Sequence, residues 1–172
     1  MPNLITQILQ DTSRPNEWHA MVVHFPVVIS VLGVGLALLL LVTLGRSHWV
    51  RWLTVALYAV GVVAALTAMD AGHDAAEHIH AMHVKLSPQA AAMLRQHAEM
   101  GKKVWIFMAL TTVLAALTAI PKKPVRITLV VLALVASLST AGWVAVTGHY
   151  GGTLVYQYGV GAPATVNNLP QK

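Results

Sequence analysis

Four long apolar segments, separated by shorter polar stretches, dominate the hydropathy pattern of this chain. They span Ala20–Leu44, Val50–Met69, Val104–Ile120 and Val125–Val146. Each is close to the roughly 20 residues that a helix needs to cross about 30 Å of hydrocarbon. The pattern predicts an all-α, polytopic membrane protein whose four transmembrane helices form an up-down bundle. We expect a single membrane domain over residues 1–172, with helices at about 20–44, 50–70, 101–120 and 125–147.

The polar stretch between the second and third apolar segments predicts a helical hairpin that projects outward beyond the membrane. The sequence AMDAGHDAAEHIHAMH, residues 68–83, is rich in alanine and lacks proline, so helix 2 is expected to continue through it. Ser87 followed by Pro88 is typical of an N-cap and a first helical residue, which starts helix 3 well before its apolar part. Residues 148–172 change to glycine, tyrosine and polar side chains, which predicts an extended C-terminal lid over the outer helix ends.

Composition and charge agree with a membrane chain and suggest its orientation. Hydrophobic residues make up 56% and charged residues 10% of the chain, whereas about a quarter of a soluble domain is charged. The short connections GRSHWVR (45–51) and PKKPVR (121–126) hold five Lys or Arg and no acid. The positive-inside rule places them in the cytoplasm, so we expect a bacterial inner-membrane protein with both termini in the periplasm. Because the net charge of +5 is placed this way, it does not indicate nucleic-acid binding.

Each predicted helix carries one histidine near its outer end. The separations are 20 residues from His24 to Leu44, 23 from Val50 to His73, 23 from His97 to Ile120, and 24 from Val125 to His149. At about 1.5 Å per residue these histidines share a height of roughly 30–36 Å. Paired imidazoles from facing helices are what b-type haem requires, whereas covalent c-type haem is excluded because the chain has no cysteine.

The pairing of these four candidate cofactor-binding residues follows from bundle geometry. In an up-down bundle helices 1 and 3 lie on one diagonal and helices 2 and 4 on the other. Haem iron would therefore be held by His24 with His97 or by His73 with His149. His149 is alternatively expected to bind a second haem or to hydrogen-bond a quinone.

Two other histidines and several glycines have simpler interpretations. We interpret His19 and His48 as polar caps at the membrane interface. Gly33 and Gly35 in helix 1 and Gly142 in helix 4 would admit a flat macrocycle, but small residues equally allow close helix packing in lipid.

The segment GHDAAEHIHAMH, residues 72–83, offers an alternative metal-ion site. His73, Glu77 and His80 share a helical face at i, i+4 and i+7, and His83 extends it by an i, i+3 pair, so Glu77, His80 and His83 are candidate ligands for zinc or copper. The spacing matches no zinc-protease motif. A solvated helix face or a docking surface explains the same residues without a metal.

Three stretches of the chain resemble a bacterial four-helix membrane family catalogued as domain of unknown function 2231. They are MVVHFPVVI (21–29), RQHAEMGKK (95–103) and TGHYGGTLVYQYGVG (147–161). His24, His97 and His149 fall within them, whereas His73 belongs to a segment that departs from the family pattern. The resemblance therefore makes His24 with His97 the first choice of haem ligands and His73 with His149 the second. Relatives are often fused to, or found with, c-type cytochrome or Rieske domains, so the resemblance implies electron transfer between the quinone pool and periplasmic carriers.

These observations predict a haem b-binding membrane electron-transfer subunit. It would link the quinone pool to a periplasmic redox partner, such as a c-type cytochrome or a Rieske protein, as a non-catalytic cytochrome b subunit of a larger complex or a homo-oligomer. The alternatives are a histidine-rich, divalent metal-binding membrane protein and a cofactor-free anchor of a larger complex. Ion transport is less favoured, because it needs polar residues through the membrane midplane and the four spans have few.

Overall fold

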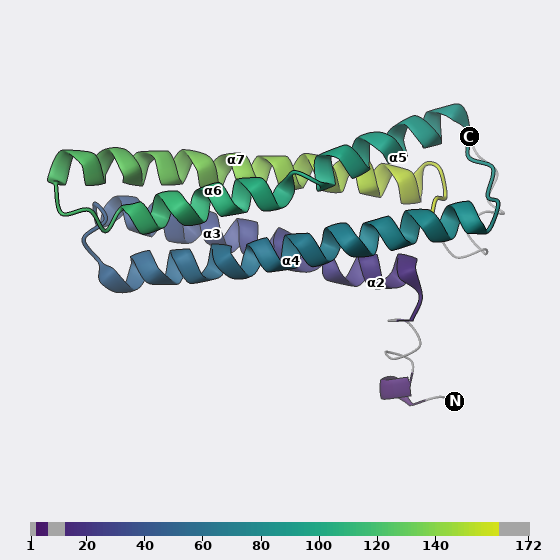
Figure 1. Ribbon diagram of the computed structural model, residues 1–172, viewed down its shortest axis with the longest axis horizontal. Coiled ribbons are helices and arrows are strands. Elements are labelled where there is room, and N and C mark those ends of the chain that lie inside the picture. Colours follow the sequence, from purple (N-terminus) through teal and green to yellow (C-terminus); the bar gives the residue numbers. More distant parts are fainter. Residues whose placement is uncertain (1–2, 7–12, 162–172) are drawn as a thin grey trace.

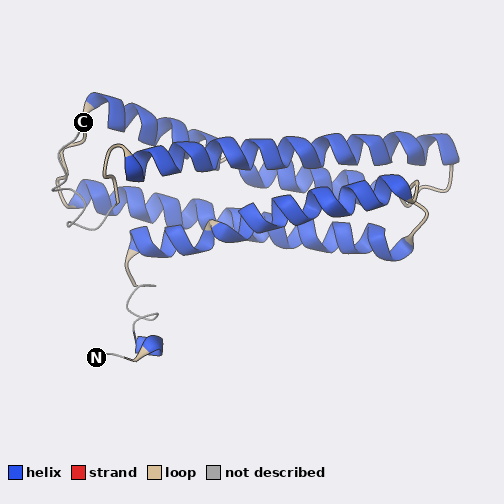
Figure 2. Cartoon of the chain, turned by 180° about the vertical axis from the view of Figure 1, so that it is seen from behind, coloured by secondary structure: helices blue, strands red, loops and turns tan. Residues whose placement is uncertain are grey.

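The computed structural model describes residues 3–6 and 13–161, which form an elongated four-helix bundle (Figure 1). Its helices are α2 (Pro15–Val22), α3 (His24–Val42), α4 (His48–Ala81), α5 (Pro88–Gly101), α6 (Val104–Leu117) and α7 (Lys123–Tyr156). Four spans are long and apolar enough to cross a membrane: α2 with α3, α4 alone, α5 with α6, and α7 alone. The described part of the chain contains no strand (Figure 2). The predicted all-α membrane fold is confirmed.

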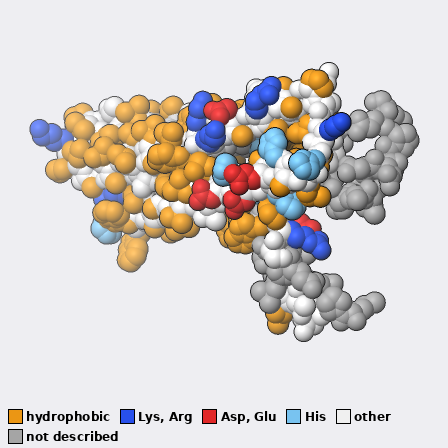
Figure 3. Space-filling view, turned by 45° about the vertical axis from the view of Figure 1, so that its right-hand side comes forward, with side chains coloured by type: hydrophobic (Ala, Val, Ile, Leu, Met, Phe, Trp, Pro, Cys, Tyr) orange, Lys and Arg blue, Asp and Glu red, His pale blue; other side chains and the backbone are white. Residues whose placement is uncertain are grey.

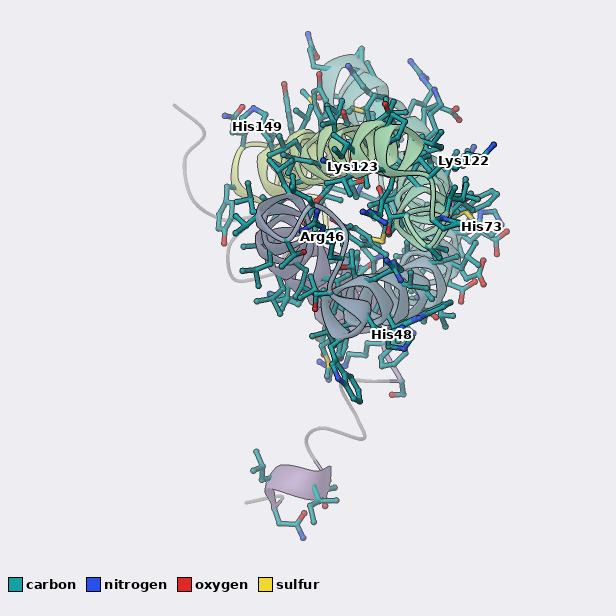
Figure 4. The ribbon with its side chains drawn as sticks, turned by 90° about the vertical axis from the view of Figure 1, so that its left-hand side faces the viewer. Arg46, His48, His73, Lys122, Lys123 and His149 are labelled. Carbon is teal, nitrogen blue, oxygen red and sulfur yellow. The ribbon has the colours of Figure 1, made fainter. Side chains whose placement is uncertain are left out.

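The two ends of the bundle differ in chemistry. The short α3–α4 and α6–α7 connections lie together at one end, which we call the basic end because it carries Arg46, Lys122 and Lys123 (Figure 4). We call the opposite end, formed by α2, α5 and the second halves of α4 and α7, the histidine end (Figure 1).

The helix starts expected from the sequence are present. The side chain of Ser87 accepts a hydrogen bond from the Ala90 amide at 3.1 Å, and Pro88 is the first residue of α5. Ser47 caps α4 in the same way, through the Val50 amide at 3.3 Å. Helix α4 runs without interruption to Ala81, so the predicted extension of helix 2 is confirmed.

The first and third spans are each interrupted near the histidine end. Helix α2 ends at Val22 and α3 begins at His24. Pro26 has no amide hydrogen, so it cannot donate to the carbonyl of Val22 as a helix would require. Between α5 and α6, the indole of Trp143 donates to the carbonyl of Met100 at 2.9 Å, which gives this carbonyl a partner at the break. Each of these spans therefore consists of a short segment at the histidine end and a longer apolar segment, joined by a break at which the backbone remains helical in φ and ψ.

The C-terminal lid was predicted wrongly for its first part. Helix α7 continues to Tyr156, so residues 148–156 are helical rather than extended. The chain turns back just after the helix at Gly159, whose φ of +65° favours glycine, and the Val160 amide donates to the Leu154 carbonyl at 2.9 Å. Val160 is buried in a small cluster with Ile79 and Ala90. The remainder of the expected lid, residues 162–172, lies outside the described residues.

The membrane core contains buried hydroxyl groups that the hydropathy pattern did not reveal. The buried polar residues are Ser30, Thr54, Thr111, Thr118, Ser137, Thr140 and Thr147. Most of these hydroxyls donate to a carbonyl of their own helix, as Thr54 does to Val50 and Thr140 to Ala136. They are thus satisfied locally and serve close helix packing.

The outer face of the bundle is apolar between its two ends. Large hydrophobic side chains remain exposed on α3, α4, α6 and α7, as expected for surfaces that contact lipid. Acidic and histidine side chains instead gather toward the histidine end (Figure 3).

Candidate functional site

The imidazoles of His19 and His97 meet inside the histidine end of the bundle. Their ring centroids are 6.1 Å apart and their planes are nearly perpendicular, at 81°. His19 lies on α2 and His97 on α5, which are the two short segments beyond the helix breaks. Both side chains are partly buried, so two polar rings face one another within the bundle.

Each ring is held by a backbone carbonyl of a neighbouring helix. Nδ1 of His19 is 3.0 Å from the carbonyl oxygen of Ala68 on α4, and Nδ1 of His97 is 3.0 Å from that of Thr147 on α7. A carbonyl can only accept, so Nδ1 must donate its hydrogen in both contacts. In the neutral ring, Nε2 then carries the free lone pair, which is the arrangement of a metal-ligating histidine.

A glycine lies directly against each imidazole. A Cβ atom at Gly72 would come within 2.9 Å of Cε1 of His19, and a Cβ at Gly151 within 2.9 Å of Cε1 of His97. Each glycine is four residues, about one turn, after the carbonyl that holds the ring. The absence of a side chain at these two positions is therefore what allows the rings to approach the helices.

The two halves of the chain build these contacts in the same way. His19 and Ala68 are 49 residues apart, and His97 and Thr147 are 50 apart. Deeper in the bundle, Tyr58 and Ser137 are hydrogen bonded at 2.6 Å and are separated by 79 residues, as are Gly72 and Gly151. The histidines thus come from corresponding positions of two similar helical hairpins.

The helices around the rings are arranged as two pairs. Helix α2 packs on α4, and α5 packs on α7, whereas α4 and α5 have few contacts with each other. Behind His19, Val22 packs with Ala68 and Ala71 in a small buried cluster. One imidazole therefore projects from each pair toward the other.

A family model described as predicted membrane protein, DUF2231, matches residues 16–164 and so covers both halves of this site. The chain belongs to the DUF2231 family. No curated protein and no solved structure matches it.

Of the four histidines predicted to form one layer in this DUF2231 protein, His97 is partly buried in the interior and the other three are exposed. Nδ1 of His24 is 2.7 Å from the carbonyl of Ala20 in the same span. Nε2 of His73 is 3.2 Å from a carboxylate oxygen of Glu77. His73 and His149 project from different sides of the bundle (Figure 4). The structure therefore brings together neither His24 with His97 nor His73 with His149.

His19 is the residue that the sequence reasoning missed. Counting residues along a helix fixes the height of a side chain but not the direction in which it points. His19 and His24 are five residues apart, so they lie about 140° apart around a helix of 3.6 residues per turn. The signal that could have revealed His19 is a repeated spacing in the sequence. The dipeptide His-Ala occurs at 19–20 and at 97–98; Gly72 follows His19 by 53 residues, and Gly151 follows His97 by 54.

The alternative metal-ion site is not assembled either. Within residues 3–6 and 13–161, no three His, Asp or Glu side chains are grouped so that they could hold a metal ion. Glu77 and His80 lie exposed on α4, and His83 follows the end of that helix with a φ of +52°. Figure 3 shows histidines and acids gathered toward this end of the surface.

Proposed function

We propose that this DUF2231 protein is a membrane electron-transfer subunit that holds a b-type haem between His19 and His97. The observation that carries the proposal is the pair of imidazoles 6.1 Å apart, each with Nδ1 bonded to a carbonyl and Nε2 left for a ligand. In such a pair the carbonyl fixes the tautomer and makes the ligating nitrogen more basic.

The residues present fit this group. A metal ion lies about 2.0–2.1 Å from an imidazole nitrogen, so two rings that share one ion in line have centroids roughly 6 Å apart. Gly72 and Gly151 let the two rings pack against α4 and α7, which supports their orientation as ligands. The two ligands come from different helix pairs, α2 with α4 and α5 with α7, so a group held by both would join the pairs.

The haem would supply one-electron transfer by its iron, and the protein would supply binding and environment. His19 and His97 would hold the iron through their Nε2 atoms. The apolar cluster of Val22, Ala68 and Ala71 would exclude water on the His19 side. This proposal replaces His24 by His19 in the expected pair, because the ring of His24 is exposed on the outside of the bundle.

The orientation and partners form part of the proposal. The basic end would face the cytoplasm of a bacterial inner membrane, by the positive-inside rule. The histidine end would then face the periplasm, within reach of a c-type cytochrome or Rieske partner. The exposed carboxylates of Asp70, Asp74 and Glu77 on α4 are of the sign that attracts a basic redox protein.

The test is the reduced-minus-oxidised visible spectrum of the purified protein, together with haem and metal analysis. We expect the sharp α band of low-spin haem iron with two imidazole ligands, and about one haem per protein chain. Bound zinc or copper without haem would favour the alternative of a metal-binding membrane protein. A protein that contains neither would favour a cofactor-free anchor and would remove the proposal.

A further inference from the structure

A second feature of the histidine end is an apolar hollow on the outside of the first span, at the break between α2 and α3. Its volume is about 610 Å³, and it is lined by Trp18, Ala20, Met21, Val22, His24 and Phe25. Phe25 is 63% exposed and Met21 41% exposed, so the hollow opens toward the surroundings of the bundle rather than into its core.

His24 is the only side chain of this lining with a strong polar group apart from the indole of Trp18. Its Nδ1 is 2.7 Å from the Ala20 carbonyl, so Nδ1 donates there and Nε2 stays available to a ligand. The position of His24, 18 residues from the end of α3 at Val42, places it about 27 Å from that helix end and thus near the membrane boundary.

The chemistry of the lining narrows the occupant. None of the six residues is Lys, Arg, Asp or Glu, so the hollow offers no fixed charge for a phospholipid headgroup. Trp18 and Phe25 provide aromatic surface for a flat ring, and His24 provides a single hydrogen bond. Below the hollow, Val28, Val31 and Leu32 continue an exposed apolar surface along α3 that suits a long hydrocarbon tail.

We infer that this hollow binds the headgroup of a lipid-soluble quinone, with Nε2 of His24 hydrogen bonded to one ring oxygen. The role of this quinone site in electron transfer rests on the proposed function. Trp18 and Val22, which line the hollow, also pack on the cluster that contains Ala68, the residue whose carbonyl holds His19. A quinone in the hollow would therefore touch the cluster that contains Ala68, whose carbonyl holds one of the two paired imidazoles.

The experiment is a titration of the purified protein with a decyl-substituted benzoquinone, followed by tryptophan fluorescence. Quinones quench tryptophan, so we expect a saturable component that is lost in Trp18→Phe and kept in the matched control Trp52→Phe, because Trp52 lies at the other end of the bundle. His24→Ala should weaken saturable binding about tenfold, the equivalent of one hydrogen bond. His24→Gln, which retains a hydrogen-bonding group, should weaken it less, and His149→Ala should leave it unchanged.

Several outcomes would overturn the inference. Quenching without a saturable component, or affinity within twofold of the unaltered protein in His24→Ala, would show that no quinone is recognised here. Displacement by decanol as effective as by the quinone would identify the hollow as a lipid-tail surface. The readout does not depend on haem, so a chain that binds the quinone but shows no haem spectrum would remove the proposed function and leave this site standing.

Discussion

The hydroxyl of Tyr58 is hydrogen bonded to the hydroxyl of Ser137 at 2.6 Å in the buried core of the bundle. Tyr58 belongs to α4 and Ser137 to α7, so this bond joins the two hairpins below the level of the paired histidines. The ring of Tyr58 fits there because α3 has a glycine at position 33, where a Cβ would overlap the end of the ring. The fixed contact between the hairpins sets how their outer parts, and hence His19 and His97, face one another.

Gly33→Ala is expected to destabilise the bundle by about 1–3 kcal/mol, because the added methyl group must displace the buried ring of Tyr58. Gly35→Ala is the matched control in the same helix, since a Cβ there would meet no atom within 4 Å. Alanine is the better helix former, so this control should be neutral or stabilising. Thermal unfolding in detergent measures both. Equal melting temperatures would contradict the packing role of Gly33.

Single alanine variants of the histidines should separate ligands from surface residues. His19→Ala and His97→Ala are expected to lose most haem, because each removes one of the two proposed iron ligands. His24→Ala, His73→Ala and His149→Ala should retain it, since these rings are exposed on the bundle. The measurement is the haem content per chain of each purified variant, after circular dichroism has confirmed its helix content. Haem loss in His24→Ala with retention in His19→Ala would restore the pair expected from the sequence.

The glycines beside the imidazoles give a test that changes no ligand. In Gly151→Ala the new Cβ would approach Cε1 of His97 to 2.9 Å, so the ring must leave the Thr147 carbonyl or shift along the helix. We expect lowered haem retention and a changed reduction potential, with the helices intact by circular dichroism. Gly148→Ala on the same helix has open space at its Cβ and should behave as the unaltered protein. Indistinguishable reduction potentials in the two variants would argue against a role of Gly151 in positioning the His97 ring.

The exposed histidines at the end of α4 should not matter to the haem. His80→Ala together with His83→Ala is expected to leave haem content near normal, because both side chains are exposed and lie beyond Gly72, which marks the level of the His19 ring. Haem analysis of the double variant checks this. A loss here, with His19→Ala still loaded, would mean that the site lies on the projecting hairpin.

Orientation can be measured directly because the chain has no cysteine. In intact cells, Ala91→Cys on α5 should be labelled by a membrane-impermeant thiol reagent that reaches the periplasm. Lys122→Cys at the basic end should be labelled only after the inner membrane is broken. The reverse pattern would invert the proposed topology and place the redox partner in the cytoplasm.

Hydropathy and local signals determined much of this architecture. The four spans, the caps at Ser47 and Ser87 and the long extension of α4 all depend on residues close in the sequence, so they could be read from it. The continuation of α7 through Gly148, Gly151 and Gly152 could not. Glycine disfavours a helix locally, and the contact that accounts for Gly151, the close approach of His97, comes from another part of the chain.

The sequence by itself also determined that histidines gather near one end of the bundle, because helical rise converts residue number into height. Only the tertiary structure decided which of them meet. That choice depends on the rotation of each helix about its axis and on the breaks at Val23 and Lys102, where α2 meets α3 and α5 meets α6. These rotations are set by packing between helices far apart in sequence, such as Tyr58 against Gly33 and Ser137, and this is why His19 rather than His24 faces His97.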